Sequence, residues 1–340
     1  MKKRALCILA IFSILLCGCT KTQNNVSEPK GKVYYSFFDT VSYIYSYAND
    51  SAERFDTLSA ECAHILREYH EFFDIYHEYE GVNNLCTLNK NAGIQPVILD
   101  ERLIDFLTES KNLYYVTDGE MNVMMGSVLS LWHEAREDGT YIPDEESLKN
   151  ASFHTDIENL IIEGNTAFIK DKESSIDVGA FAKGYATQKA ADYLIDNNAD
   201  SYVLNIGGNI CIIGNKPDNT GWSTAIKDPK NPSESFCEKL YISDISCVTS
   251  GVYERFFTVD GVKYHHIIDK DTLYPSTYYD SVTVLCKDSG IADALSTALF
   301  CMDEKSGTKL AQEMNAQVLW VYPDGTKSMT PGMGDYIEEE

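Results

Sequence analysis

Hydrophobic positions recur at helical spacing in several stretches of the chain. In the longest, residues 52–79, Leu58, Cys62, Ile65 and Leu66 follow one another every one to four positions. This spacing places apolar side chains on one helix face, so the stretch predicts an amphipathic helix. Further helices are predicted over 102–117, 123–136, 180–197 and 291–302.

Aromatic and β-branched residues dominate the runs between these helices. Residues 33–47 predict either one long strand or a strand pair. Residues 160–171 predict a hairpin that turns at Glu163-Gly164-Asn165, and 202–213 predict a strand pair containing Gly207-Gly208. Shorter strands are predicted at 239–242, 247–250, 255–259, 265–268, 281–286 and 318–322, and loops at 81–93 and 139–150.

The combination of helices and hairpins defines the fold class. It indicates an α+β protein with mixed, largely antiparallel sheets and packed helices. No clear linker interrupts residues 31–340. We therefore expect that segment to be a single catalytic unit.

The first thirty residues indicate export. Three basic residues at 2–4 precede an apolar run over 5–17, which has the length of a signal-peptide core. Small residues before Cys19 resemble a bacterial lipobox. We predict a signal peptide over 1–18, lipidation of Cys19, a flexible tether over 19–30 and anchoring at the extracytoplasmic face of the cell membrane. An ordinary signal peptide with an incidental cysteine is the alternative.

Charge narrows the choice of partners. The chain has 52 acidic and 28 basic residues among 340, a formal net charge of −24. Such a surface repels phosphate backbones, so a nucleic-acid partner is not expected. The seven cysteines after Cys19 contain no CxxC pair, which argues against a zinc site; most should be small buried hydrophobes.

Two glycine-containing segments are candidates for binding an anion. Asp177-Val-Gly-Ala-Phe-Ala-Lys183-Gly184 lies at the expected start of a helix, where backbone N–H groups and the helix dipole favour negative charge. A close-packed turn with a solvated lysine explains it equally well. Gly207-Gly208, inside a strand run, indicates either a bulge or a close approach of ligand to backbone.

Two further segments carry candidate catalytic and metal-binding groups. The adjacent His265 and His266 would face opposite sides of a strand, so His266 could serve as a general base while His265 packs inward. Both are structural in the alternative interpretation. Asp293 and Thr297 are four residues apart on a largely apolar helix, and their oxygens suit Mg²⁺. A solvated polar pair is the alternative, but a buried aspartate needs a partner.

These segments together resemble the ApbE-type flavin transferases, which are lipoproteins or secreted FAD:protein FMN transferases. The resemblance covers nearly all of the chain after Lys32. It rests on five motifs in order: DVGAFAKGYA (177–186), LNIGGNI (204–210), TSGVYERFF (249–257), YHHIIDKDTLYP (264–275) and ADALSTALF (292–300).

The resemblance implies a ligand set. Asp293, Thr297 and the backbone carbonyl of Ala180 would hold Mg²⁺ beside the diphosphate of FAD. Residues implied to contact the FAD substrate are Phe38, Tyr76, Asn122, Lys183, Gly208, Ser250 and Ile268.

The resemblance also implies a reaction. A threonine hydroxyl of a target protein would attack the FMN-side phosphorus, with His266 as the candidate base and AMP as the leaving group. The expected targets are secreted-side subunits of ion-pumping redox complexes. Hydrolysis of FAD to FMN and AMP, and flavin binding without catalysis, are the alternatives.

Two segments depart from the family pattern, at 119–124 and at 269–275, of which the second has lost a proline and a glycine. Asn122 stands where the family has an aspartate, so flavin recognition is expected to differ. Leu273 stands where the family has a glycine, which predicts another conformation for that turn.

Overall fold

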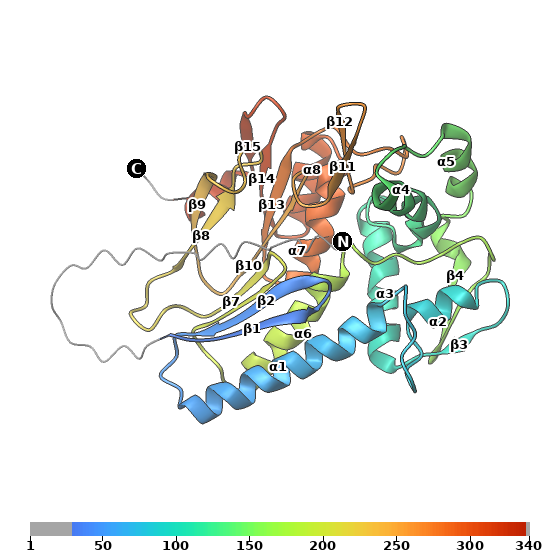
Figure 1. The fold of residues 1–340 in the computed structure, drawn as a ribbon. Helices are drawn as coiled ribbons and strands as arrows, with labels where there is room; N and C mark the ends of the chain where they lie inside the picture. Colours follow the sequence, from blue (N-terminus) through green and yellow to red (C-terminus); the bar gives the residue numbers. More distant parts are fainter. Residues whose placement is uncertain (1–28, 338–340) are drawn as a thin grey trace, which may run out of the picture.

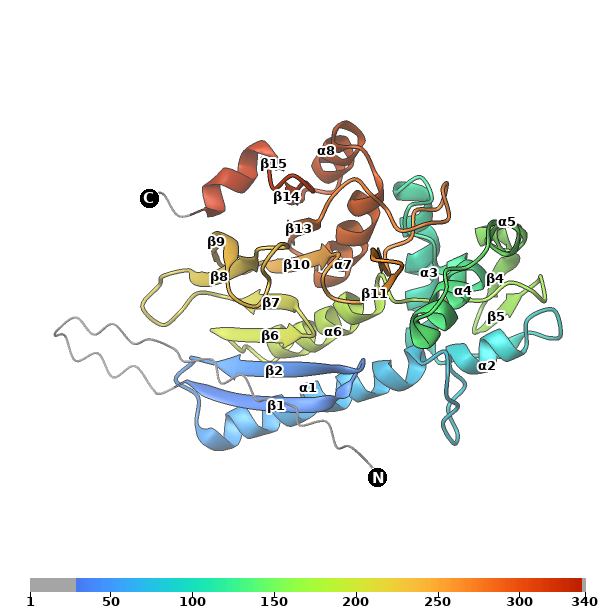
Figure 2. The same ribbon diagram turned by 45° about the horizontal axis from the view of Figure 1, so that its top comes forward.

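An eight-stranded antiparallel sheet forms the centre of the computed structural model, which describes residues 29–337 (Figures 1 and 2). Its strand order is β1-β2-β6-β7-β10-β13-β14-β15. These strands are β1 (Lys30–Phe37), β2 (Thr40–Ser46), β6 (Tyr202–Ile206), β7 (Asn209–Ile213), β10 (Ser246–Gly251), β13 (Ser281–Cys286), β14 (Gln317–Val321) and β15 (Lys327–Met329).

Three smaller sheets surround the central one. β3 (Val97–Ile98), β5 (Thr166–Ile169) and β4 (Leu160–Glu163) form a three-stranded sheet in that order. β8 (Trp222–Lys227) pairs with β9 (Phe236–Ile242), and β11 (Phe256–Val259) pairs with β12 (Val262–His265).

Eight α-helices and four 3₁₀ turns complete the described part of the chain. The helices are α1 (Ala52–Phe73), α2 (Leu85–Lys90), α3 (Glu101–Val116), α4 (Gly126–Asp138), α5 (Glu145–Ser152), α6 (Ala182–Asp196), α7 (Ser289–Ala298) and α8 (Glu304–Glu313). The 3₁₀ turns are η1 (Val123–Met125), η2 (Ile157–Asn159), η3 (Leu299–Cys301) and η4 (Pro331–Tyr336). The α+β class expected from the sequence is confirmed.

The central sheet is covered on both faces. On one face α1 packs on α6, α6 packs on α7, and α7 packs on β10 and β13 (Figure 1). On the other face lie the β8–β9 ribbon and η4. Because successive side chains alternate between faces, Trp320 of β14 joins the core under α7 while Leu319 joins the core under Trp222. Both are fully buried, which explains why this strand reads as an uninterrupted apolar run.

A second group of elements, α2 to α5 with the small sheet β3-β5-β4, lies beyond the start of α6 (Figure 2). Phe106 of α3 stacks on Phe181, directly before α6, with ring centroids 5.0 Å apart and planes inclined by 16°. Tyr185 of α6 packs edge-on against both rings. This aromatic cluster fixes where α6 begins.

The longest helix is confirmed, but it ends earlier than expected. Leu58, Cys62 and Leu66 are buried on one face of α1, and burial of each leucine contributes about 1.5–3 kcal/mol. The helix stops at Phe73 because Asp74 turns the chain: its carboxylate accepts hydrogen bonds from the N–H groups of Tyr76 and His77.

Other local expectations were wrong. The loop expected at 81–93 contains α2, which Asn84 caps by accepting the N–H of Thr87. The loop expected at 139–150 contains the start of α5, capped in the same way by Asp144. The strand expected at 265–268 is instead β12, which ends at His265.

The strand pair over 33–47 and the hairpin at Glu163-Gly164-Asn165 are both observed. The described cysteines are free, and six of the seven are buried, as expected. Within residues 29–337, no helix has the length and apolar character needed to cross a membrane. The predicted signal peptide and Cys19 lie outside the described residues, and the division into segments 1–18, 19–30 and 31–340 stays a prediction.

Candidate functional site

The start of α6 packs directly against α7. Gly184 lies in the first turn of α6, and a Cβ at that position would lie 2.3 Å from the carbonyl oxygen of Ser289 and 2.4 Å from Cβ of Asp293. Both distances are shorter than real Cβ contacts allow. Gly184 is therefore required for the close approach of the two helices.

Asp293 is the buried carboxylate at this junction. Its residue exposure is 4%, and its Oδ2 accepts a 2.8 Å hydrogen bond from the N–H of Gly184. The ammonium of Lys183 lies 3.7 Å from the same oxygen. The partner that a buried aspartate needs is thus supplied by a backbone donor and a cation.

The Ala180 carbonyl lies just outside α6. Ala180 precedes the N-cap Phe181, and the helical hydrogen bonds begin with the Tyr185 N–H and the Phe181 carbonyl. The N–H of Gly184 is one of the helix-start donors without an acceptor inside the helix, and it donates to Asp293. Within residues 29–337 no backbone N–H donates to the Ala180 carbonyl. The carbonyl oxygen therefore stays available to a ligand.

Thr297 lies one turn after Asp293 on α7 and is partly buried. Ser296, beside it, donates to the carbonyl of Asp293 at 2.9 Å and lies 2.8 Å from the hydroxyl of Ser250 on β10. Ser250, predicted to contact FAD, is thus held by α7 in this structure.

The two adjacent glycines have different roles. Gly207 has φ +58° and packs closely: a Cβ there would lie 2.5 Å from the side chain of Thr40. Gly208 has φ +97° and is exposed, and a Cβ at that position would have no heavy atom within 4 Å. Next to it, the amide nitrogen of Asn209 is buried without a hydrogen-bond partner in the described protein. Of the two glycines, only Gly208 leaves space for a ligand.

The turn between β1 and β2 carries Phe38 at φ +52°. Its N–H donates to Nδ1 of His70 at 3.3 Å, and its ring meets the imidazole edge-on. Helix α1 therefore positions Phe38, which is only partly buried.

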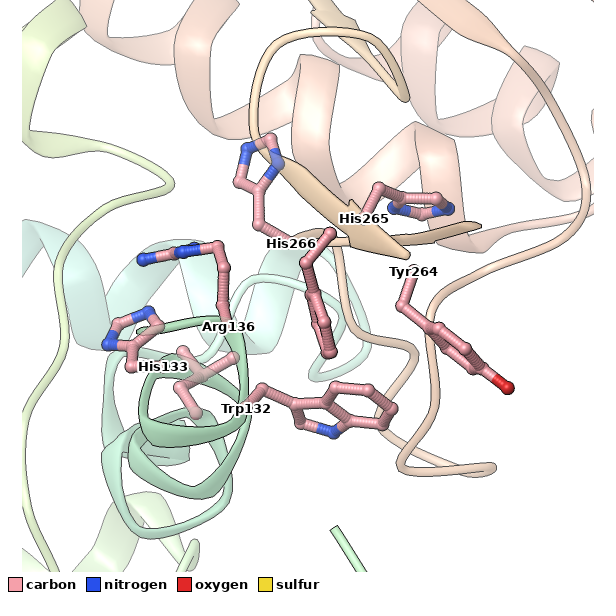
Figure 3. A pocket seen from close by; sticks show the side chains of 8 residues that line it. Trp132, His133, Arg136, Tyr264, His265 and His266 are labelled. Atoms are coloured by element: carbon pink, nitrogen blue, oxygen red, sulfur yellow. The ribbon is translucent and has the colours of Figure 1, made fainter. Parts of the chain in front are cut away.

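The two consecutive histidines differ as expected. His265 is 8% exposed; its Nε2 donates to the carbonyl of Ser276 at 2.9 Å, and its Nδ1 accepts the N–H of Ile267 at 3.2 Å. Both nitrogens are thus used within the fold. His266 follows directly after β12 and lines a pocket (Figure 3).

His266 is held as a neutral imidazole. Its Nδ1 donates to the carbonyl of Arg255 at 3.2 Å, and because a carbonyl only accepts, Nε2 is the nitrogen without a proton. Burial, with the positive charge of Arg255, lowers the pKa of His266 to about 3. Its Nε2 can therefore accept a proton throughout the neutral range.

The pocket beside His266 contains residues that the sequence analysis did not single out. Helix α4 contributes Trp132, His133 and Arg136, and the β11–β12 hairpin contributes Phe257 and Tyr264 (Figure 3). Its interior holds about 10 Å³, enough for one water molecule. A nucleotide could only lie across the rim, against the side chains that border it.

Tyr76 reaches this pocket through His133. The Tyr76 hydroxyl lies 3.0 Å from Nδ1 of His133, and Nε2 of His133 lies 3.9 Å from a carboxylate oxygen of Asp177. Asp177 opens the segment that leads through Ala180 to Lys183. The segment 177–183 therefore connects the pocket to the Asp293 junction. The sequence did offer one signal for these pocket residues: His133 and Arg136 are three positions apart in the predicted helix, so their side chains share one face.

Asn122 and Ile268 have fold contacts of their own. The Asn122 side chain accepts the N–H of Met124 and donates to the carbonyl of Thr155, so both ends of its amide are engaged. Ile268 pairs with Pro275 in an isolated bridge. Leu273, between them, has φ +64°, in the region that favours glycine. That the turn differs in conformation from that of the family stays a prediction.

The residues of the junction fit a hard cation and a diphosphate. Asp293 offers a carboxylate, Thr297 a hydroxyl and Ala180 a carbonyl without a backbone donor, all oxygen ligands of the kind Mg²⁺ takes. Among the described residues no group of three His, Cys, Asp or Glu side chains could hold a metal. This mixed ligand set would depend on further oxygens from water or phosphate. The exposed Gly208 and the orphaned amide of Asn209 are compatible with a ligand beside them.

Comparisons with known proteins agree with this architecture. The model of the ApbE family matches residues 38–320, so the chain belongs to the ApbE family. It is 32% identical over 321 residues to the FAD:protein FMN transferase of Vibrio cholerae, covering 92% of each chain. It is also 32% identical over 270 residues to the protein of that name from Treponema pallidum, covering 74% of each.

Solved structures agree as well. The crystal structure of the ApbE protein of Thermotoga maritima superposes with a TM-score of 0.82 at 26% identity, covering 92% of this chain and 100% of that one. The flavin transferase ApbE of Vibrio cholerae superposes with a TM-score of 0.78 at 29% identity, covering 91% and 99%. The family resemblance inferred from the five motifs is thus confirmed.

Proposed function

We propose that this protein is an FAD:protein FMN transferase, which transfers FMN from FAD to a threonine hydroxyl of a target protein and releases AMP. The observation that supports the proposal most strongly is the packing of the start of α6 against α7. There the buried Asp293 accepts the N–H of Gly184 and faces Lys183, and no backbone N–H among the described residues donates to the Ala180 carbonyl. Membership of the ApbE family supports the same activity.

The reaction balances without a redox partner. The threonine oxygen forms a bond to the FMN-side phosphorus, and the bond from that phosphorus to the bridging oxygen breaks. AMP leaves with the bridging oxygen, and the hydroxyl proton passes to a base. The product is a phosphoester between FMN and the target protein.

His266 is the proposed base. Its Nε2 carries no proton, since Nδ1 donates to the Arg255 carbonyl. A low pKa, about 3, makes the imidazole a weak base, so its role is to take the hydroxyl proton late, as the new phosphorus–oxygen bond forms. Positioning by the Arg255 carbonyl fixes which nitrogen faces the reaction.

Lys183 and the α6 N-terminus are proposed to hold the diphosphate. The partial positive charge of a helix start and the lysine ammonium both favour an anion, which a chain of net charge −24 otherwise repels. Asp293, Thr297 and the Ala180 carbonyl are the proposed ligands of Mg²⁺, which when bound would neutralise phosphate charge and orient the diphosphate.

The test uses protein from residue 31 onward, FAD, Mg²⁺ and a recipient domain that carries an acceptor threonine. Transfer predicts flavin fluorescence that stays on the recipient in a denaturing gel, with one AMP released per flavin attached. A recipient whose threonine is replaced by alanine is the control. Free FMN and AMP without labelling would indicate hydrolysis, and bound, unconsumed FAD would indicate a non-catalytic flavin-binding protein; either result contradicts the proposal.

The location and partners are also proposals. The lipobox-like sequence at 16–19 supports a lipid anchor on Cys19 at the extracytoplasmic face of the cell membrane. Flavinylated subunits of ion-pumping redox complexes on that side of the membrane are the proposed recipients. Metabolic labelling with a fatty acid tests the anchor: label on the wild type and none on Cys19→Ala is the expected result.

A further inference from the structure

We propose that Arg136 and His133, on one face of α4, form an anion subsite that binds a phosphate group of the flavin dinucleotide. The inference rests on the proposed function, since it assigns a ligand to side chains at the rim of the same site. It concerns residues that lie outside the five sequence motifs.

The first observation is an arginine without a partner. Arg136 is partly buried, yet within residues 29–337 its guanidinium makes no ion pair and no hydrogen bond to the protein. On a chain with 52 acidic residues, a half-buried arginine has many carboxylates from which to draw a partner. Its five N–H donors suit the bidentate binding of a phosphate.

The second observation is that positive charge converges here. Burial lowers the pKa of His133 most, and Arg136 and Arg255 lower it further, while the carboxylates of Asp177 and Glu137 raise it. Arg255 and Lys183 in turn both lower the pKa of His266. Arg255 likewise has no ion pair in the described part of the chain. Arg136 therefore lines the opening itself, and Arg255 and Lys183 lie near enough to its other side to act on His266.

The third observation is the direction of the side chains. His133 and Arg136 leave α4 on the same side of the helix, as their i, i+3 spacing requires, and extend away from Trp132 (Figure 3). His266 lies across the opening, on the β12 side (Figure 3). A ligand that contacts both sides would bridge α4 and the proposed base.

Asp177 links His133 to the segment that is proposed to hold the diphosphate. Its carboxylate lies 3.9 Å from Nε2 of His133, and three residues later the chain reaches the Ala180 carbonyl. The Tyr76 hydroxyl, 3.0 Å from Nδ1, holds the other side of the His133 ring. This arrangement fixes the imidazole beside Arg136. We therefore assign Arg136 as the anion-binding group and His133 as its neighbour in the subsite.

FAD offers two phosphates, on the FMN side and on the AMP side, and the same chemistry binds either. The test measures binding rather than turnover: dissociation constants of FMN and AMP for the wild type and for Arg136→Ala, with EDTA present. Riboflavin and adenosine serve as the probes without phosphate. Two further variants serve as controls. Arg136→Lys keeps the positive charge but loses the planar guanidinium, and Arg67→Ala removes an exposed arginine of α1, away from the pocket.

We expect Arg136→Ala to weaken FMN or AMP binding roughly ten- to one-hundred-fold, the usual effect of losing a hydrogen bond to a charged group. Arg136→Lys should lose less. Riboflavin and adenosine should bind unchanged, as should all four probes to Arg67→Ala. The nucleotide that is weakened identifies which phosphate occupies the subsite.

Two results would overturn the inference. Unchanged FMN and AMP affinities in a folded Arg136→Ala protein would show that Arg136 binds no phosphate. An equal loss for riboflavin or adenosine would assign it to a ring instead. Neither result depends on labelling of a recipient, so the proposed transferase activity is judged separately.

Discussion

The N–H of Gly184 donates to Oδ2 of Asp293 at 2.8 Å and so joins the first turn of α6 to the middle of α7. The bond orients the carboxylate and pairs a helix-start N–H that has no acceptor inside α6. One backbone N–H therefore positions one of the three proposed metal ligands. The predictions on this junction separate the charge of Asp293 from its structural role.

Asp293→Asn is expected to fold but to lose transfer. The amide oxygen can still accept the Gly184 N–H, so the midpoint of thermal unfolding should stay close to that of the wild type. The negative charge is gone, and we expect transfer to fall by at least roughly 100-fold. Labelling rates over a Mg²⁺ titration provide the measurement. Wild-type rates with unchanged Mg²⁺ dependence would remove Asp293 from the metal site.

Gly184→Ala is expected to destabilise the fold. The added Cβ would lie 2.3 Å from the Ser289 carbonyl oxygen and 2.4 Å from Cβ of Asp293, and neither atom can rotate away. Overpacking costs about 1–3 kcal/mol, whereas alanine gains at most about 1 kcal/mol over glycine in a helix. We therefore expect a net loss in urea unfolding. Gly334→Ala, where no heavy atom lies within 4 Å of the added Cβ, is the matched control. Equal stability of the two variants would contradict the tight packing.

The strongest local sequence patterns predicted elements such as the longest helix and the hairpin at Gly164. The apolar stripe of α1 and the turn at Gly164 act between neighbours in sequence, so periodicity and turn chemistry were sufficient. The short helices α2 and α5 were missed because six and eight residues are too few to show a clear helical period, and their starts are marked only by the capping side chains Asn84 and Asp144. Helix α8 went unpredicted, since its sequence is largely polar.

The residues of the candidate site likewise fall into those that the sequence predicted and those that it did not. The junction residues were found because Lys183 and Asp293 stand in motifs with family counterparts. The contact between Tyr76 and His133 spans 57 residues and comes about only when the segment after α1 folds against α4, so no local pattern predicts it. Arg136 shows its significance only through the partners it lacks. Sequence spacing cannot reveal that.

Glu120→Gln is expected to change how stability depends on pH. Burial raises the pKa of Glu120 to about 7, although Lys270 lies 3.2 Å away and opposes this. The carboxyl is therefore more easily protonated in the folded than in the unfolded chain. Its contribution to stability is present below the unfolded pKa, near 4.5, and is lost as the pH rises through 7.

The glutamine variant removes this titration. Its stability relative to the wild type should be higher at pH 8 than at pH 5 by about 1–3 kcal/mol. Urea unfolding of both proteins at the two pH values gives the comparison. Parallel pH profiles would mean that Glu120 titrates normally. Glu134→Gln, an exposed carboxylate on α4, is the control.

His266→Gln is expected to lose transfer, roughly 10²- to 10⁴-fold if the imidazole is the base. Because the pKa of His266 is lowered to about 3, the wild-type rate should show no inflection near pH 6.5 from this residue.

Stability gives an independent test of the same pKa. The unfolded chain protonates this histidine near its ordinary pKa of 6.5 and the folded protein does not, so the contribution of His266 is fully present above pH 6.5 and is lost as the pH falls toward 3. Removing the imidazole should therefore make the acid loss of stability shallower. His64→Gln, whose side chain is 59% exposed on α1, should leave both the rate and the acid profile unchanged. A rate inflection near pH 6.5 that disappears in His266→Gln would mean that the imidazole is solvated and protonates normally, and an unchanged rate would assign the proton transfer to another group.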